Sequence, residues 1–191
     1  MPLSMPVLES ERLILRLGDP KDIDSIIHYF TVNQAYLQPF EPQRPDNFLT
    51  PGYWAAELEA RRQDAVQKRS LKLFIFEQAA PAVVIGAINL NNMIWGVFQA
   101  ATLGYSLAAA KQRQGYMSEA GSQLIRYGFE VLNLHRIMAN YMPHNQRSAN
   151  VLKRLGFEIE GTAKDYLFIN GGWQDHVLTS RINPDWRLNH S

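Results

Sequence analysis

The segment from Ala101 to Met142 constrains the fold of this chain more than any other part of the sequence. Ala101–Leu107 is a strand-like apolar run, Ser118–Leu132 has the apolar periodicity of a helix, and Arg136–Met142 is a second strand-like run. A strand, a helix and a strand in this order make a βαβ crossover, in which the two strands are parallel neighbours. The sequence therefore predicts an α/β (α+β) fold, with the intervening turn at the sheet edge where ligands commonly bind.

That turn, Gln112–Ser118, has the features of an anion-binding site. Its backbone N–H groups lie where the helix begins, so they lack intrahelical acceptors and carry the positive end of the helix dipole. Gly115 lets the backbone approach an anion closely, Ser118 can cap the helix, and Glu119 suits its first turn. The alternative is an ordinary strand-to-helix loop without a ligand, because a single glycine turn is a weak signal.

Further strands and helices flank this crossover. Strand-like runs are Arg12–Leu17, Leu71–Phe76, Val83–Leu90, Glu158–Ala163, Leu167–Ile169 and Gln174–Ser180. Helical patterns are Ile23–Phe30, Gly52–Arg69 and Gln146–Leu155, the last with Asn145 as its N-cap. Short links predict an antiparallel meander from Leu71 to Leu107, and Asn170-Gly171-Gly172 predicts a hairpin. Three prolines make Gln38–Pro45 a loop, whose Phe40 and Glu41 could face a ligand.

Composition favours one unexported domain that spans residues 1–191. The hydrophobic content of 46% suffices for one core, and 19 basic against 18 acidic residues leave a net charge of +1. Such a balance predicts no nucleic-acid site and no membrane partner. The chain has no cysteine, which excludes disulfides and thiolate nucleophiles. Because Met1–Ser10 lacks a signal-peptide pattern, we expect a cytoplasmic protein.

Several motifs in order resemble the GNAT-type N-acetyltransferases. Gln112, Gly115 and Met117 lie at the strand-to-helix junction, and they are followed by Asn145 with Ser148 and then by Leu155-Gly156-Phe157. More narrowly, four segments look like the RimJ branch of the RimJ/RimL-type ribosomal-protein alanine N-acetyltransferases. These segments are Leu103–Leu107, His135–Asn145, Ala163–Leu167 and Trp173–His176. The resemblance covers nearly the whole chain from Glu9 onward.

The resemblance implies a mixed, splayed sheet of about six to seven strands with about four helices, and acetyl-CoA between the strands that end at Leu107 and Met142. It places the pyrophosphate on the backbone of the glycine turn and implies no metal. The implied cofactor-binding residues are Ser106, Leu107, Gln112, Arg113, Gln114, Gly115, Tyr116, Met117, Ser118 and Asn145. Met117 departs from the family, which usually has glycine or alanine there.

The catalytic residues follow from the same resemblance. Many GNAT enzymes place a tyrosine seven residues after the capping asparagine to protonate the departing thiolate, but this chain has Leu152 there. Ser148 matches the RimJ/RimL pattern as the proton donor, although it can equally serve only the backbone of the first helical turn. Backbone N–H groups near Ser106 and Leu107 would receive the oxyanion.

The acceptor amine decides how strong a base the reaction needs. An α-amine with a pKa of about 7.7 to 8.0 is roughly a tenth neutral at pH 7, whereas a lysine amine near 10.4 is almost fully charged. Glu160 is the first candidate base, before Asp175 and Glu41, although each carboxylate can also be an ordinary surface or turn residue. Phe40, Glu41 and Asp175 are the expected substrate contacts. His135 and His176 lack metal-ligand spacing and are expected to be structural.

The predicted function is transfer of acetyl from acetyl-CoA to the N-terminal α-amine of a ribosomal protein, with alanine as acceptor residue, by direct attack in a ternary complex. One alternative is a GNAT enzyme that acts on a small amine, such as a drug or polyamine. The other is a non-catalytic CoA-binding or ribosome-associated assembly protein. The acceptor protein, the base and the oligomeric state stay open.

Overall fold

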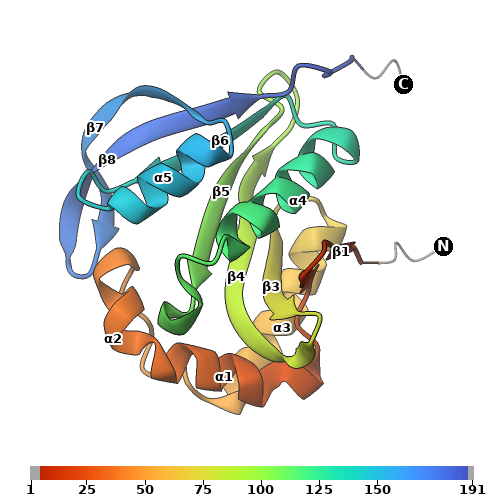
Figure 1. Cartoon of the computed structure of the whole chain (residues 1–191), viewed down its shortest axis with the longest axis vertical. Helices are drawn as coiled ribbons and strands as arrows, with labels where there is room; N and C mark the ends of the chain where they lie inside the picture. The colour runs from red at the N-terminus through yellow and green to blue at the C-terminus, as the bar shows by residue number, and fades with distance from the viewer. Residues whose placement is uncertain (1–4, 189–191) are drawn as a thin grey trace.

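The chain folds around one mixed sheet, which a computed structural model describes together with its helices over residues 5–188 (Figure 1). Eight strands follow the order β1-β2-β3-β4-β5-β6-β8-β7. They are β1 (Val7–Glu9), β2 (Leu13–Arg16), β3 (Leu71–Glu77), β4 (Ala80–Ile94), β5 (Ala100–Leu107), β6 (Arg136–Tyr141), β7 (Glu158–Ile169) and β8 (Gly172–Ile182). The predicted mixed sheet is confirmed, with slightly more strands than expected because β1 adds a short edge strand.

Helices cover both faces of the sheet. The α-helices are α1 (Ile23–Val32), α2 (Gln34–Leu37), α3 (Pro51–Val66), α4 (Tyr116–Glu130) and α5 (Gln146–Arg154). Short 3-10 turns are η1 (Pro20–Asp22), η2 (Gln38–Phe40) and η3 (Ala109–Lys111). Among residues 5–188, no helix is long and apolar enough to cross a membrane.

The hydrophobic core has two parts because β3 is buried on both faces. Leu73 and Ile75 belong to the core under α4, whereas Phe74 and Phe76 belong to the core under α1 and α3. Successive side chains of a strand point to opposite faces, so one apolar strand serves both layers. Trp54 of α3 is fully buried in the second layer.

The strands β5 and β6 pair in parallel, as the crossover pattern predicted, but only over a short length. Ala100–Thr102 pair with Arg136–Met138, and the two strands then diverge. Every other neighbouring pair in the sheet is antiparallel, including the predicted meander β3-β4-β5. The divergence leaves space between β5 and β6 in the middle of the sheet.

The β7–β8 hairpin closes one side of that space. Its turn has Asn170 and Gly171 at φ of 47° and 82°, which is the left-handed geometry of a two-residue hairpin. The backbone N–H of Asn170 donates to the carbonyl oxygen of Glu41 at 3.1 Å. The tip of the hairpin is thereby joined to the proline-rich segment after α2, as the approach of the blue hairpin to the orange helix shows (Figure 1).

Two predicted boundaries beside the cavity were wrong. The helix expected from Ser118 begins at Tyr116 with Gly115 as its N-cap, so Ser118 lies inside the first turn and does not cap it. The segment expected to be a loop from Gln38 begins with the turn η2, because Pro39 lies in the first turn, where its missing N–H costs no helical hydrogen bond.

Candidate active site

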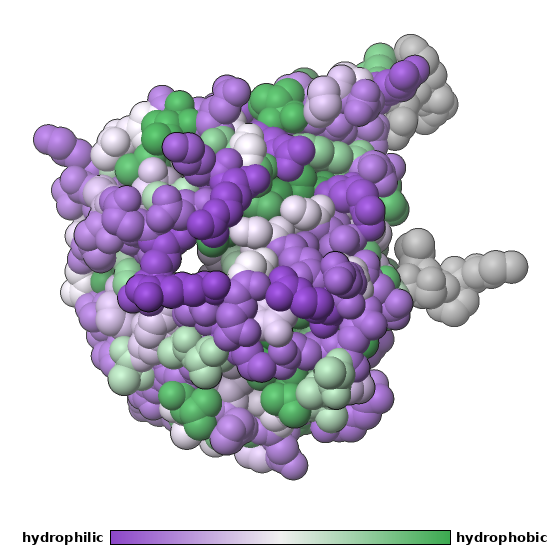
Figure 2. Space-filling model, in the orientation of Figure 1, coloured by the Kyte–Doolittle hydropathy of each residue, from purple (hydrophilic) through white to green (hydrophobic). Residues whose placement is uncertain are grey.

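A cavity of about 420 Å³ lies where β5 and β6 diverge. Figure 2 shows an opening in the molecular surface in this region, surrounded largely by hydrophilic residues. Of the predicted site residues, the lining includes Phe40, Glu41, Ser106, Leu107, Gln112, Met117, Asn145 and Ser148. It also includes residues that were not predicted to bind or react, among them Tyr36, Tyr105, Asn140, Arg147 and His176. Seven parts of the sequence therefore contribute to one cavity: β4, the end of β5, the turn before α4 with its first residues, the end of β6, the start of α5, α2 with the segment after it, and the β7–β8 hairpin.

The turn before α4 presents free backbone donors beside this cavity. Gly115 has a φ of 81° and Arg113 a φ of 62°, so the chain reverses in left-handed conformations that glycine adopts easily. Within residues 5–188, no acceptor receives the N–H groups of Gly115–Ser118, and the first helical hydrogen bond is from Glu119 N to Gly115 O. Four consecutive donors at the positive end of a 15-residue helix suit an anion such as a phosphate.

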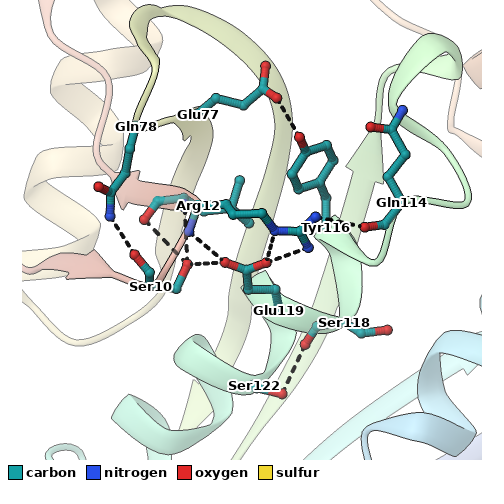
Figure 3. A network of polar contacts seen from close by, with 10 residues as sticks. Ser10, Arg12, Glu77, Gln78, Gln114, Tyr116, Ser118, Glu119 and Ser122 are labelled. Carbon is teal, nitrogen blue, oxygen red and sulfur yellow. Dashed lines mark hydrogen bonds and ion pairs between the residues drawn. The ribbon is translucent and has the colours of Figure 1, made fainter.

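A network of charged groups holds this turn in place (Figure 3). Arg12 Nε donates to Glu119 Oε2 at 2.8 Å, and Arg12 Nη1 donates to the carbonyl oxygen of Gln114 at 3.0 Å. Ser10 Oγ and the backbone N of Arg12 donate to Glu119 Oε1 at 2.7 Å and 2.9 Å. The segment before β2 is therefore tied to the first turn of α4.

Electrostatics of the network favour the charged form of its carboxylates. Burial alone would raise the pKa of Glu119, but hydrogen bonds from Ser10 and Arg12 outweigh it and lower that pKa below the usual range. Hydrogen bonds from Lys111 and Tyr116 lower the pKa of Glu77. The phenol of Tyr116 donates to Glu77 at 2.6 Å, and this hydrogen bond fixes the Tyr116 side chain within the network.

The remaining residues of the predicted cofactor set do not line the cavity. Arg113, Gln114, Gly115, Tyr116 and Ser118 lie in the turn and first helical residues beside it. Their backbone N–H groups lie at the helix start, where the sequence predicted the anion site.

Ser148 and Tyr105 form a hydroxyl pair in the cavity. Asn145 Oδ1 accepts from Ser148 N at 3.1 Å, which confirms Asn145 as the N-cap of α5. The hydroxyl of Ser148 is free of that task and lies 2.8 Å from the Tyr105 hydroxyl. Burial raises the pKa of Tyr105 to about 12, so its phenol stays protonated near neutral pH. Leu152, at the position where related enzymes place a tyrosine, is buried in the core.

Helix α1 fixes the end of β5 from the other face of the sheet. The Tyr29 hydroxyl donates to Ser106 Oγ at 2.9 Å, and the backbone N of Ala109 donates to Asn33 Oδ1 at 2.9 Å. Burial raises the pKa of Tyr29, so its phenol also stays protonated and can donate. These contacts hold the backbone at the mouth of the cavity.

Two predicted acidic residues lie outside the cavity. Glu160 accepts hydrogen bonds from Arg136 at 2.5 Å and from Ser180 at 2.9 Å, and the Arg136 bond lowers its pKa. It is therefore a poor base and does not face the site. Asp175 is exposed and accepts from the backbone N of Asp165 at 2.9 Å. The structure therefore does not bring Glu160, the predicted base, or Asp175, a predicted substrate contact, into the cavity.

Asp175 and His176 are adjacent in β8, but only His176 lines the cavity. Adjacent residues of a strand point to opposite faces, so the buried His176 lines the cavity while Asp175 faces outward. Tyr105, which was not predicted, lines the cavity together with its predicted neighbour Ser106. The available signal was that both neighbours lay at the ends of strands predicted to border the site.

Acidic side chains elsewhere do not assemble a metal site. Across residues 5–188, no group of three or more histidine, cysteine, aspartate or glutamate side chains could hold a metal ion.

Comparisons with known proteins agree with this geometry. Residues 12–158 match the family model described as an acetyltransferase (GNAT) domain. The [ribosomal protein uS5]-alanine N-acetyltransferase of Escherichia coli K12 is 42% identical over 179 residues, which cover 94% of this chain and 92% of that protein.

Two solved structures have the same fold. The ribosomal-protein-S5-alanine acetyltransferase of Vibrio fischeri has a TM-score of 0.90 at 38% identity, covering 96% of this chain and all of that one (100%). Mycobacterium smegmatis RimJ, solved in complex with CoA-disulfide, has a TM-score of 0.85 at 25% identity, covering 96% of this chain and 89% of that one.

The first prediction concerns the carboxylate that anchors the turn. Glu119→Gln should lower the free energy of unfolding at pH 7 by about 1 to 3 kcal/mol, because charge-assisted hydrogen bonds from Ser10 and Arg12 are weakened. The pKa of Glu119 is lower in the folded state, so its contribution is present above the unfolded value of about 4.3 and is lost as pH falls through the folded value. Denaturant melts from pH 7 to pH 3 measure both effects.

Glu9→Gln is the matched control, since Glu9 is an exposed carboxylate of β1. The control should unfold like the wild type at every pH. Equal stability of Glu119→Gln and wild type at pH 7 would contradict the anchoring role.

Proposed function

The chain belongs to the GNAT family of acetyltransferases, and from that premise we propose that it transfers an acetyl group from acetyl-CoA to the N-terminal α-amine of a ribosomal protein, with alanine as the acceptor residue. The observation that supports this proposal most strongly is the 42% identity, over 94% of the chain, to a [ribosomal protein uS5]-alanine N-acetyltransferase. The whole chain, residues 1–191, then acts as a single acetyltransferase domain.

The turn before α4 is the proposed site for the pyrophosphate of acetyl-CoA. Its free N–H groups from Gly115 to Ser118 fit an anion, and the CoA complex of the related RimJ supports a CoA ligand for this fold. Gln112 Nε2 donates to the Leu107 carbonyl at 3.0 Å, which links the turn to the end of β5. Arg113 and Gln114 contribute backbone, while Asn145 borders the channel from α5.

The end of β5 is the proposed site of acetyl transfer. Backbone groups of β5 beyond Thr102 that point toward β6 have no strand partner, because pairing with β6 ends there. Free N–H groups near Ser106 and Leu107 are suited to stabilise negative charge on the carbonyl oxygen during attack. Tyr29 and Met117 hold this region through the Ser106 hydroxyl and through core packing.

Ser148 is the proposed donor to the departing thiolate. Its hydroxyl lines the cavity and has a second hydroxyl, that of Tyr105, at 2.8 Å. The Tyr105 hydroxyl can donate its proton to Ser148 Oγ or to the Ser148 carbonyl oxygen at 3.3 Å. In the first arrangement the Ser148 proton is free to point at the sulfur. Tyr105 is thus a positioning residue, and Leu152 contributes only packing.

The peptide acceptor enters between the β7–β8 hairpin and the segment after α2. Phe40 and Glu41 line the cavity from that segment, and Leu167 and Ile169 line it from the hairpin. An α-amine suits the site because roughly a tenth of it is neutral near pH 7. Its deprotonation at that pH costs roughly 3.5 kcal/mol less than deprotonation of a lysine amine. The cavity holds one predicted acid, Glu41, rather than the dense acidic cluster that a polyamine would need.

Gly115→Val should weaken acetyl-CoA binding by about tenfold or more, which corresponds to at least 1.4 kcal/mol. A branched side chain strains the left-handed backbone at φ of 81° and disturbs the donors of the turn. Calorimetric titration with acetyl-CoA measures the effect. Gly96→Val is the control, because Gly96 has a similar φ of 71° and open space around its Cβ. An unchanged affinity in a folded Gly115→Val would place the pyrophosphate elsewhere.

Ser148→Ala should lower kcat by about 10 to 1,000-fold with a smaller change in acetyl-CoA affinity, since it removes the proton donor. Ser122→Ala is the control, because that hydroxyl only donates to the Ser118 carbonyl of its own helix. Stopped-flow detection of free CoA thiol separates the chemical step from product release. Wild-type rates of the chemical step in Ser148→Ala would remove this residue from the mechanism.

The substrate class is tested with peptides. A peptide that begins with alanine should be acetylated at its α-amine, whereas the same peptide with a blocked α-amine and a free internal lysine should not. The reason is the larger neutral fraction of the α-amine near pH 7. Mass spectrometry locates the acetyl group. Comparable turnover of the blocked peptide or of a polyamine would favour a lysine or small-amine acetyltransferase, and no turnover of any amine would favour a non-catalytic CoA-binding protein.

A further inference from the structure

His176 brings an imidazole into the acceptor side of the cavity. It belongs to β8, whose Val177 pairs with Tyr141 near the end of β6, so His176 lies just past the point where β6 stops. The side chain is 4% exposed and lines the cavity. Leu167 and Ile169 of the same hairpin line the cavity beside it.

Hydrogen bonding selects one tautomer of this imidazole. Nδ1 lies 2.9 Å from the carbonyl oxygen of Gln174, and a carbonyl can only accept a hydrogen bond. Nδ1 therefore carries the hydrogen, and Nε2 keeps a lone pair. Among residues 5–188, no group donates to Nε2. The imidazole is therefore more than nine-tenths buried, lines the cavity, and has one ring nitrogen that can accept a proton.

We propose that His176 is the general base that removes a proton from the α-ammonium group of the acceptor peptide. The proposal rests on the proposed function and supplies the base that the carboxylates of the site do not provide. An imidazole with Nδ1 fixed to a backbone carbonyl is a common form of a catalytic base, because the carbonyl holds the ring and stabilises the charge that forms.

The other groups around the cavity are poorer bases. Glu41 lines the cavity but is paired with the guanidinium of Arg44. Arg147 is a cation whose Nη1 donates to the Tyr36 hydroxyl, so it can repel ammonium but cannot accept its proton. From β7, the ring of Tyr166 packs against the imidazole at a centroid distance of 5.7 Å.

The proton balance of the reaction assigns one step to each group. Nε2 of His176 takes a proton from the ammonium, and the neutral amine nitrogen forms a bond to the thioester carbonyl carbon. The bond between that carbon and sulfur breaks, and the thiolate receives a proton through Ser148. The second proton lost by the nitrogen replaces the one that Ser148 gave. His176 then releases its proton to solvent, so one proton leaves per amide formed.

His176→Asn tests the base because an asparagine amide can still donate to the Gln174 carbonyl but cannot take up a proton. His176→Gln, which places its amide nearer to the position of Nε2, is the second variant. The expected result for both is a fall in kcat/KM for an alanine-starting peptide of about 100 to 10,000-fold. Acetyl-CoA affinity by calorimetry and the Tm should stay within the range of the wild type. His28→Asn, on an exposed position of α1, is the control for loss of an imidazole.

A second acceptor separates base catalysis from positioning. The same peptide with an aminooxyacetyl group in place of alanine presents a nitrogen that is already neutral at pH 7, so it needs no base for its activation. If His176 is the base, the variants should lose less than about tenfold in kcat/KM with this acceptor. If His176 had only a structural or binding role, the variants would lose the same factor in kcat/KM with both acceptors, and the proposal would be overturned. Full activity of either variant with the alanine peptide would also overturn it.

Failure of this proposal can be told apart from failure of the proposed function. If the wild-type protein acetylates neither acceptor, the function is wrong. If the wild type acetylates the alanine peptide and both variants do so at the wild-type rate, only the base is wrong. If His176→Asn does not fold, His176→Gln with the two acceptors decides.

Discussion

The parting of β5 from β6 is the constraint on which the site depends. Parallel pairing holds for Ala100–Thr102 and stops, although both strands continue. Backbone N–H and C=O groups that lose their strand partner must find another, since leaving them buried and unpaired is costly. The cavity at this point offers water or a ligand as that partner. A ligand with its own amides can replace the missing strand, which suits the pantetheine arm of the proposed acetyl-CoA.

Segments distant in the sequence fix the end of β5 and the start of α4. Tyr29 of α1 and its C-cap Asn33 fix the end of β5, and Arg12 with Ser10 fixes the start of α4 through Glu119. The first two contacts cross the sheet from one face, and the last two act on the other. Because these contacts are charged or buried, the donors of the turn are set in position before any ligand binds. Such preorganisation lowers the entropy lost on binding.

The acceptor side is built differently from the cofactor side. It is formed by the β7–β8 hairpin and the segment after α2, which meet through Asn170 and Glu41. The catalytic groups that we propose come from both sides: Ser148 with Tyr105 from the divergence, and His176 from the hairpin. Ser148 and His176 line the same cavity, so the proposed acid and base can act in one ternary complex without a covalent intermediate.

The sequence by itself determined the features that arise from near neighbours in the chain. The crossover of β5, α4 and β6, the cap at Asn145 and the left-handed turn at Asn170 with Gly171 follow from periodicity and from local backbone preferences. The glycine turn was found for the same reason, although the helix begins two residues before the predicted start.

Only the tertiary structure decided which side chains meet. Glu119 accepts a hydrogen bond from Arg12, which is 107 positions away in the sequence. Glu160 of β7 accepts one from Arg136 of β6. On strands, period-two alternation allows either of two neighbours to face inward, and only packing against the next layer selects one. That selection placed His176 rather than Asp175 in the cavity, and it paired Tyr105 with Ser148 across the gap between β5 and α5.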